Sequence, residues 1–148
     1  MLIDQAGISR LIPHAGRMIL IDAVVSWDAE EIRCTARSHR NVDNPLRDCG
    51  RLHCLSGIEY AAQSMAAHGT LAAQNGQRLP VLGYLASVRD LIYSIEWLDE
   101  APEVLEIWAK CLFHNGFRSI YQFSLSGEGV TLLSGCFAVV YVPAEKGM

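Results

Sequence analysis

Residues 51–76, RLHCLSGIEYAAQSMAAHGTLAAQNG, decide the fold of this chain. Residues 54–74 contain no proline and are rich in Ala, Leu, Ile and Met. Their apolar residues recur every three to four positions, which is the period of an α-helix rather than of a strand. These positions are Leu55, Ile58, Ala61, Ala62, Met65, Ala66 and Leu71. At 1.5 Å per residue such a helix is about 30 Å long, the width of a small domain, so other elements are expected to close around it.

Both ends of this helix carry local signals. Ser56 is followed three residues later by Glu59, the spacing of a capping box in which two side chains satisfy backbone N–H groups of the first turn. At the other end, Asn75 and Gly76 readily adopt the left-handed conformation that ends a helix. Glu59 is the acid of the first turn and the centre of the functional hypothesis.

Length and charge limit the classes of protein to which the chain can belong. Its 148 residues suit a single domain, residues 1–148. No apolar run approaches the roughly 20 residues that cross a bilayer, so we expect no membrane span. The net charge is −4 and no basic cluster is visible. Nucleic acid is therefore not expected as a partner, because its binding depends on neutralising phosphates.

The five cysteines form an odd number without CxxC spacing. This usage predicts reduced thiols in a cytoplasmic protein. Cys49 and Cys54 flank the helix start, where a thiol can become reactive, but no paired base accompanies them and we expect ordinary thiols. The histidines and cysteines also lack metal-ligand spacing, so we expect no metal and no cofactor.

The rest of the chain is predicted to form strands. Residues 19–27 and 31–38 precede the helix, and residues 39–53 form a polar loop that leads into it. The later strand-like segments are residues 80–87, 91–97, 103–113, 117–125 and 130–142. The last of these is apolar on both faces, which is typical of a central strand. Because only one helix is available as a crossover, the sheet must be mostly antiparallel, and we predict an α+β domain with the sheet wrapped around the helix.

Three motifs within this order resemble the hot-dog fold of the β-hydroxyacyl-acyl-carrier-protein dehydratases. Ile12-Pro13-His14 and the apolar run Met18–Asp22 are similar to the segment that leads into that family's first strand. Ile58–Gln63 (IEYAAQ) is similar to the start of its central helix, and Asn44-Pro45 echoes the loop before it. The resemblance covers residues 10–70 by motif and the remainder by strand pattern.

One departure from the family lies in the loop before the helix. The dehydratases carry Gly-His-Phe-Pro-Gly there, and its histidine is their catalytic base. Residues 44–53 of this chain are NPLRDCGRLH, shorter and without that motif. The chain looks more like a divergent branch of predicted dehydratases found with aryl-polyene synthesis genes, whose members also lack the loop histidine. The resemblance therefore implies acyl-thioester chemistry in general more than dehydration by this chain alone.

Dehydration of a 3-hydroxyacyl thioester removes a proton from C2 and protonates the hydroxyl that leaves C3. The resemblance assigns the acid to Glu59, which burial beside an acyl tunnel would keep protonated near pH 7; the alternative is that Glu59 only caps the helix. Gln63, one turn on, is expected to hold the Glu59 carboxylate or the substrate. Free N–H groups at the helix start, near Ser56, Gly57 and Ile58, would polarise the thioester carbonyl.

Two histidines are candidates to assist Glu59. His14 matches the family's Pro-His, and His53 lies six residues before Glu59, where it could replace the absent loop histidine. Each could instead be a hydrogen-bonded loop residue without a chemical role. The other histidines, His39, His68 and His114, are interpreted as structural or surface residues.

Hot-dog domains resemble one another in joining sheets edge to edge, and the family's sites lie between two chains. We therefore expect a homodimer or larger homo-oligomer, or a heterodimer with another hot-dog chain. Residues 81–91 are the apolar strand expected to pair in this way, and Tyr60 and Ser64 are expected at the subunit contact. An unprotected long edge in a monomer would invite aggregation, which independently favours a dimer.

Three functions follow from these observations. The first is a dehydratase acting on 3-hydroxyacyl thioesters of acyl carrier protein or coenzyme A, in fatty-acid or polyene-type lipid synthesis. The second is a partner subunit that contributes Glu59 and its helix to a chain that supplies the loop histidine. The third is a thioesterase in which Glu59 activates water.

Overall fold

The computed structural model of the chain describes residues 2–77 and 81–143. Its helices are α1 (Gln5–Ile8) and α2 (Gly57–Gln74), and its strands are β1 (Ala23–Trp27), β2 (Glu31–Ala36), β3 (Val81–Tyr93), β4 (Leu105–His114), β5 (Arg118–Gly127) and β6 (Val130–Pro143). Short 3-10 turns in the connections are η1 (Gly16–Met18), η2 (Ser38–Arg40), η3 (Cys54–Ser56) and η4 (Leu98–Glu100).

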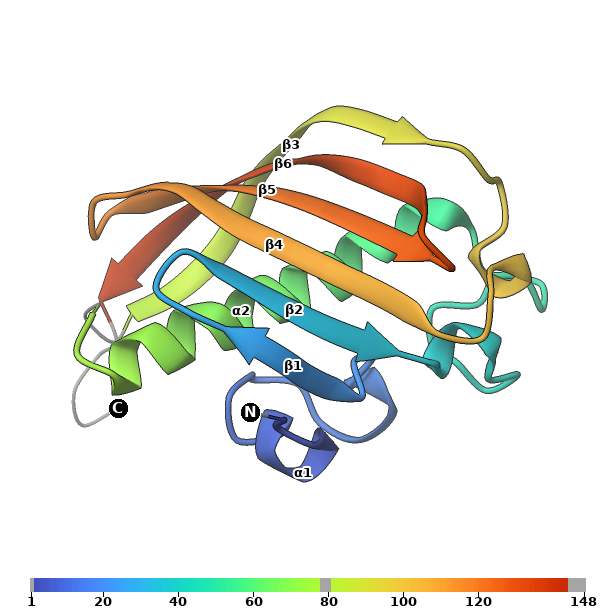
Figure 1. Cartoon of the computed structure of the whole chain (residues 1–148), viewed down its shortest axis with the longest axis horizontal. Helices are drawn as coiled ribbons and strands as arrows, with labels where there is room; N and C mark the ends of the chain where they lie inside the picture. Colours follow the sequence, from blue (N-terminus) through green and yellow to red (C-terminus); the bar gives the residue numbers. More distant parts are fainter. Residues whose placement is uncertain (1, 78–80, 144–148) are drawn as a thin grey trace.

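The six strands form one antiparallel sheet in the order β1-β2-β4-β5-β6-β3. The sheet curves around α2, which runs along its length (Figure 1). The predicted α+β architecture, an antiparallel sheet wrapped around one long helix, is confirmed. Strand β6 lies inside the sheet between β5 and β3, as its two apolar faces predicted.

The start of α2 differs from the prediction, and its end does not. Ser56 has helical backbone angles and its side chain makes no capping hydrogen bond, so the predicted capping box is wrong. The physical reason is that η3 precedes α2 and is itself capped by His53, whose Nδ1 accepts from the Leu55 N–H at 3.1 Å. At the end, Gly76 has φ +74°. Hydrogen bonds from Gly76 to Ala73 and from Gln77 to Ala72 complete a Schellman motif.

The first turn of α2 packs tightly onto the sheet. A Cβ on Gly57 would lie 2.7 Å from Leu133 Cδ2 and 2.9 Å from Leu125 Cδ2, closer than any side chain allows. The absence of a side chain at Gly57 therefore serves the contact between α2 and strands β5 and β6. Deeper in the core, the rings of Phe123 and Phe137 stack with centroids 4.3 Å apart.

Strand β3 replaces the two strands predicted at residues 80–87 and 91–97, of which residue 80 lies outside the described residues. Its pairing with β6 is interrupted between Leu85 and Ser87 and between Arg89 and Ile92. Asp90, inside the second interruption, has φ +55°. Such bulges bend a strand without ending it, which explains why the sequence reads as two segments. Among the described strands, β3 pairs only with β6 and so forms an edge of the sheet.

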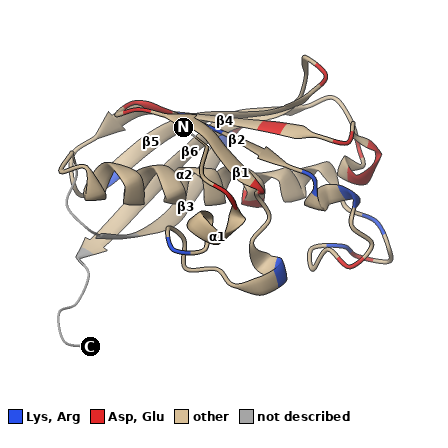
Figure 2. Cartoon of the chain, turned by 60° about the horizontal axis from the view of Figure 1, so that its bottom comes forward, with Lys and Arg blue, Asp and Glu red and all other residues tan. Residues whose placement is uncertain are grey.

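Charged residues lie mainly on loops and strands, whereas α2 carries only one, Glu59 (Figure 2). Within the described ranges, no helix is both long enough and apolar enough to cross a membrane.

Candidate active site

Glu59 lies in the first turn of α2, and its side chain is exposed in the single chain. The sequence-based prediction that Glu59 is protonated depended on burial of its carboxyl group. A single copy of the chain does not bury this group. Three large apolar side chains near this end of the helix are also exposed: Leu55 (40%), Ile92 (70%) and Tyr93 (49%).

His53 is held at the same end of α2 by contacts on two sides. Its ring meets the edges of Tyr93 and Trp97, with centroid distances of 6.0 and 5.7 Å. The Arg51 guanidinium lies 4.3 Å from the centre of the Trp97 ring. Because Nδ1 of His53 accepts the Leu55 N–H, the neutral ring carries its proton on Nε2. In this state Nε2 of His53 can donate a hydrogen bond, and neither ring nitrogen is free to accept one.

The backbone donors predicted at the helix start are engaged within the chain. The Ser56 N–H donates to His53 O at 2.9 Å, and the Gly57 N–H bonds to carbonyls of η3. Ile58 is half-buried against the core, and the face of Gly57 is filled by sheet side chains. Ser56 and Gly57 therefore do not offer the free N–H groups that the sequence predicted, because the 3-10 turn uses them.

Gln63 is fully buried, and both ends of its amide bind backbone groups. Its Oε1 accepts from the Leu20 N–H at 2.8 Å and its Nε2 donates to Met18 O. The amide thus holds the segment before β1 against α2, and it gives no hydrogen bond to Glu59 in the structure. The sequence did not reveal this role because the first strand was predicted over residues 19–27, and residues 19–22 form an irregular segment instead.

His14 lies in the segment that Gln63 holds. It is half-buried, and its Nδ1 is enclosed without a hydrogen-bond partner among the described residues. Gly16, two residues later, has φ +60° and turns the chain into η1. Gln63 therefore brings the His14 segment to α2 one turn beyond Glu59.

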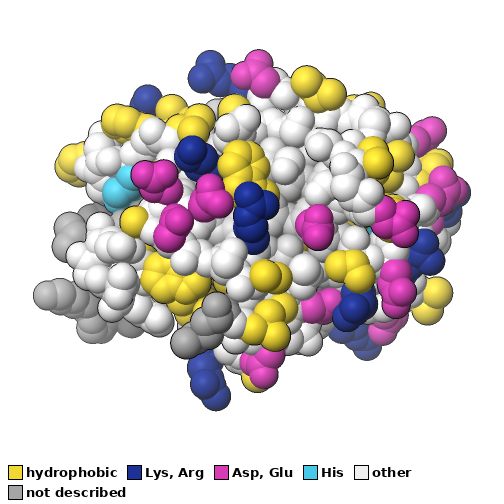
Figure 3. All heavy atoms as spheres, in the orientation of Figure 1, with side chains coloured by type: hydrophobic (Ala, Val, Ile, Leu, Met, Phe, Trp, Pro, Cys, Tyr) yellow, Lys and Arg dark blue, Asp and Glu magenta, His cyan; other side chains and the backbone are white. Residues whose placement is uncertain are grey.

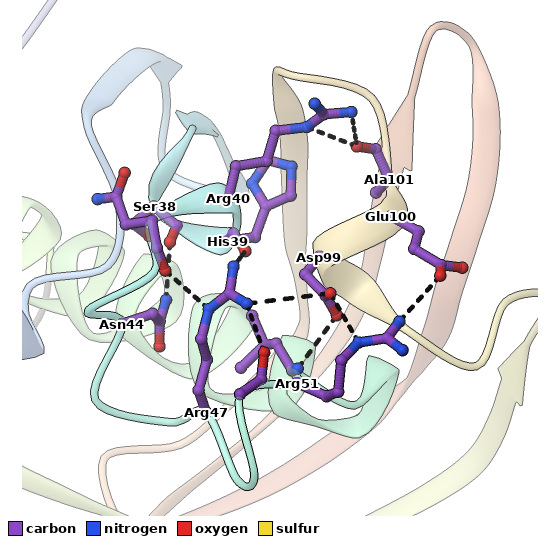
Figure 4. Close-up of polar contacts among 12 residues, drawn as sticks. Ser38, His39, Arg40, Asn44, Arg47, Arg51, Asp99, Glu100 and Ala101 are labelled. Carbon is purple, nitrogen blue, oxygen red and sulfur yellow. Dashed lines mark hydrogen bonds and ion pairs between the residues drawn. The ribbon is translucent and has the colours of Figure 1, made fainter.

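The loop between β2 and α2 is fixed by Arg47 (Figure 4). Its guanidinium donates to three backbone carbonyls of the loop, those of Asn41, Gly50 and His39, at 2.7, 2.8 and 3.2 Å. It also lies 4.0 Å from the Asp99 carboxylate. The loop that lacks the family's histidine is therefore a well-anchored structure of its own.

Asp99 joins this loop to the segment after β3. It accepts from the Arg51 Nε at 3.0 Å and from the Leu52 N–H at 3.1 Å (Figure 4). Burial alone would raise the pKa of Asp99, but these hydrogen bonds outweigh it and hold the pKa below its ordinary value. The contacts fix the chain immediately before His53. Sequence reasoning missed Arg47 and Asp99, because a loop arginine paired with a distant aspartate leaves no local pattern.

Tyr60 and Ser64 were predicted at a subunit contact, and that prediction is wrong. Both side chains are fully buried within the chain. Ser64 Oγ donates to Tyr60 O at 3.1 Å, and the Tyr60 hydroxyl bonds to Ser38 and Asn44. The physical reason is that this face of α2 turns toward the sheet and the loop.

The two cysteines near the site differ in accessibility. Cys54 is fully buried, and burial raises its pKa to about 11. Cys49 is exposed at the tip of a tight turn, with φ +51°. Among the described residues, no three His, Cys, Asp or Glu side chains are grouped so as to hold a metal ion.

A shallow hollow of about 250 Å³ lies elsewhere, over β1, β2, β4 and β5. Its lining includes Arg33, Thr35, Glu106, Trp108 and Ser124, and none of the candidate site residues. The face of the molecule in Figure 3 mixes acidic, basic and scattered apolar side chains. Glu59 and His53, two of the candidate residues, lie instead at the start of α2.

Comparison with known proteins identifies the family. The family model described as ApeP-like, ApeP dehydratase, matches residues 6–147. Comparison with curated proteins gives no match.

Solved structures share the fold. The dehydratase heterocomplex ApeI:P from Xenorhabdus doucetiae superposes with a TM-score of 0.80 at 20% identity, covering 94% of this chain and 91% of that chain. A mutant of the thioesterase PA1618 from Pseudomonas aeruginosa superposes with a TM-score of 0.65 at 15% identity, and the match covers 96% of each chain. A hypothetical thioesterase with coenzyme A from Streptococcus pneumoniae superposes with a TM-score of 0.56 at 14% identity. This match covers 83% of this chain and 87% of that chain. These likenesses confirm the predicted hot-dog fold.

Proposed function

The chain belongs to the ApeP-like dehydratase family, and we propose on that basis that it dehydrates 3-hydroxyacyl thioesters. The observation that carries the proposal is that Glu59, in the first turn of α2, and His53, which packs against Tyr93 of edge strand β3, lie at the same end of the helix. Glu59 is the only charged residue of that helix. A lone carboxyl group beside a ring N–H donor and an apolar rim suits an acyl thioester.

The hydrogen bonds of the two histidines divide the roles in this reaction. His53 can only donate through Nε2, which suits it to polarise the thioester carbonyl while negative charge develops at C2. Glu59, as the acid, gives a proton to the hydroxyl, which leaves C3 as water. The proton on C2 goes to a neutral imidazole, for which His14 is this chain's candidate because Gln63 holds its segment against α2.

A second hot-dog chain is part of the proposal. Strand β3 is an edge among the described strands and ends at Tyr93, against which His53 packs. A chain added along β3 would bury the exposed Leu55, Ile92 and Tyr93 and would remove Glu59 from bulk water. The ApeI:P assembly is a heterocomplex, which supports a different hot-dog chain as the partner, with a second copy of this chain as the alternative.

The experiment is mass spectrometry of a 3-hydroxyacyl thioester incubated with the purified protein. The substrate is presented on acyl carrier protein and, separately, on coenzyme A. Loss of one water with the chain alone supports a self-sufficient dehydratase. Loss of water only after addition of a hot-dog chain containing Gly-His-Phe-Pro-Gly supports the paired enzyme. An unchanged substrate in both cases contradicts the proposed function.

Thioester hydrolysis is the second candidate. It is favoured by the exposure of Glu59, which leaves the carboxylate open to a water molecule, and by the thioesterases among the structures that share the fold. In the same experiment, hydrolysis gives the free acid, and it does so equally with a saturated acyl thioester that has no 3-hydroxyl. A cytoplasmic location remains part of the proposal, in keeping with five cysteines that are free in the structure.

A further inference from the structure

A buried hydrogen-bond network joins Tyr60 to both segments that carry the candidate histidines. Its hydroxyl lies 2.8 Å from Ser38 Oγ and 3.0 Å from Asn44 Nδ2, and the Ser38 hydroxyl lies 2.6 Å from Leu20 O. Tyr60 is fully buried. Buried polar groups of this kind are stable only when each is hydrogen-bonded, so the network holds all of its residues in fixed positions.

The direction of each hydrogen bond among Leu20, Ser38, Tyr60 and Asn44 is determined. Leu20 O can only accept, so the Ser38 hydroxyl donates to it. Ser38 Oγ must then accept from the Tyr60 hydroxyl, and the Tyr60 oxygen accepts from the Asn44 amide. Burial also raises the pKa of Tyr60, which keeps the hydroxyl protonated as this arrangement requires.

The first segment held in this way carries His14. Leu20 is bound at both of its backbone groups by side chains linked to α2. Its N–H donates to Gln63 Oε1, and its carbonyl accepts from Ser38, which Tyr60 holds. Tyr60 and Gln63 are one turn apart on the helix, so they fix both the position and the direction of the segment before β1.

The second segment is the loop that ends at His53. Asn44 donates to Ser38 O at 2.9 Å as well as to Tyr60, and its Oδ1 accepts from the Leu46 N–H at 2.9 Å. Arg47 then binds the loop carbonyls, as Figure 4 shows, and Asp99 fixes the chain at Leu52. Tyr60 is the point at which this network reaches α2.

We propose that Tyr60 is a positioning residue, whose hydroxyl sets the places of His14 and His53 relative to the adjacent Glu59. The inference rests on the proposed function. Groups that move protons must be held within hydrogen-bond reach of the reacting atoms, and a displacement of about 1 Å can cost up to about 100-fold in rate. Removal of the hydroxyl leaves the Tyr60 ring in place but removes the hydrogen bonds by which Tyr60 of α2 holds Ser38 and Asn44.

The test compares Tyr60→Phe with Tyr121→Phe. Tyr121 is also fully buried, and its hydroxyl bonds to His68 Nδ1 at 2.6 Å, two turns further along α2. Both substitutions remove one buried tyrosine hydroxyl, so both are expected to lower the melting temperature. Only Tyr60→Phe is expected to lower kcat for dehydration, by about 10-fold to 100-fold, with KM unchanged, below the melting temperature of either variant.

Three results would overturn the inference. These are an unchanged kcat in folded Tyr60→Phe, an equal loss of kcat in both variants, or a change confined to KM. If Tyr60→Phe does not fold, Ser38→Ala breaks the same network at its next member and is expected to lower kcat likewise; an unchanged kcat would reject the inference. A wild-type protein without dehydratase activity would instead count against the proposed function.

Discussion

The Nδ1 atom of His53 accepts a hydrogen bond from the backbone N–H of Leu55 at 3.1 Å, and this contact determines how the ring can act. The cap uses the lone pair of the ring, so the proton stays on Nε2. A residue that was a candidate base by sequence is therefore a donor by structure. The same contact also explains why the helix does not need Ser56 and Glu59 as caps.

Substitutions of His53 separate its capping role from its chemical role. His53→Ala removes the cap and is expected to lower the free energy of unfolding by about 1 kcal/mol. His53→Asn keeps a side-chain acceptor at this position, so stability should be largely retained while the ring donor is lost. Urea unfolding and the dehydration assay on both variants test this. Full activity in His53→Asn would show that the ring has no role beyond the cap.

Cysteine alkylation tests the arrangement around the start of α2. Burial raises the pKa of Cys34 and of Cys54 to about 11, so only about 0.1% of either thiol is ionised at pH 8. Cys49 is exposed in its turn. Iodoacetamide should therefore label Cys49 in the native protein and reach Cys34 and Cys54 only after unfolding. Peptide mapping by mass spectrometry gives the order in which the cysteines are labelled. Equal labelling of Cys54 and Cys49 in the folded chain would contradict the structure.

The buried His39 should make stability depend on pH. Its Nε2 donates to Pro102 O at 2.7 Å, and burial holds its pKa below the ordinary value near 6.5. As the pH falls, His39 therefore binds a proton in the unfolded chain before it does so in the folded chain. The free energy of unfolding should be level above about pH 7 and should fall below about pH 6.5, by at most about 1.4 kcal/mol per pH unit, until the pH reaches the lowered pKa.

The control for this pH dependence is His39→Gln, which keeps an amide donor but cannot titrate. Its unfolding free energy, measured by urea denaturation between pH 5 and 8, should lack the part of the slope that His39 contributes. Asp28 and Asp99 also have lowered pKa values, but they affect stability only below about pH 4. Identical slopes in both proteins would show that His39 is not the group responsible.

Local periodicity and end signals were sufficient to predict the fold from the sequence. The apolar spacing of residues 54–74, the stop at Gly76 and the alternating strands all correspond to elements of the structure. The capping box failed because Ser56 already lies inside a 3-10 turn, which no local pattern revealed. The break predicted within β3 is a bulge at Asp90, and a sequence pattern does not separate a bulge from a turn.

The site was less predictable because its contacts join distant parts of the chain. Gln63 lay on the predicted face of the helix, but its partners, Met18 and Leu20, are more than 40 residues away. Tyr60 looked like a surface residue until the loop folded over it. Family resemblance suggested Glu59 and His14 as site residues, and His53 was suggested by its place six residues before Glu59, whereas the direction of the His53 hydrogen bond required the structure.

The central claim is that Glu59 performs chemistry, and Glu59→Gln tests it most directly. The variant is compared with Glu103→Gln, which changes an exposed acid in the loop before β4. Because Ser56 and Glu59 do not form a capping box, Glu59→Gln should unfold at the same temperature as the wild type. Mass spectrometry of a 3-hydroxyacyl thioester, with the partner chain present if the wild type requires it, should detect loss of one water with Glu103→Gln at the wild-type rate. Glu59→Gln should slow that loss at least about 100-fold. Dehydration at the wild-type rate by folded Glu59→Gln would contradict the account.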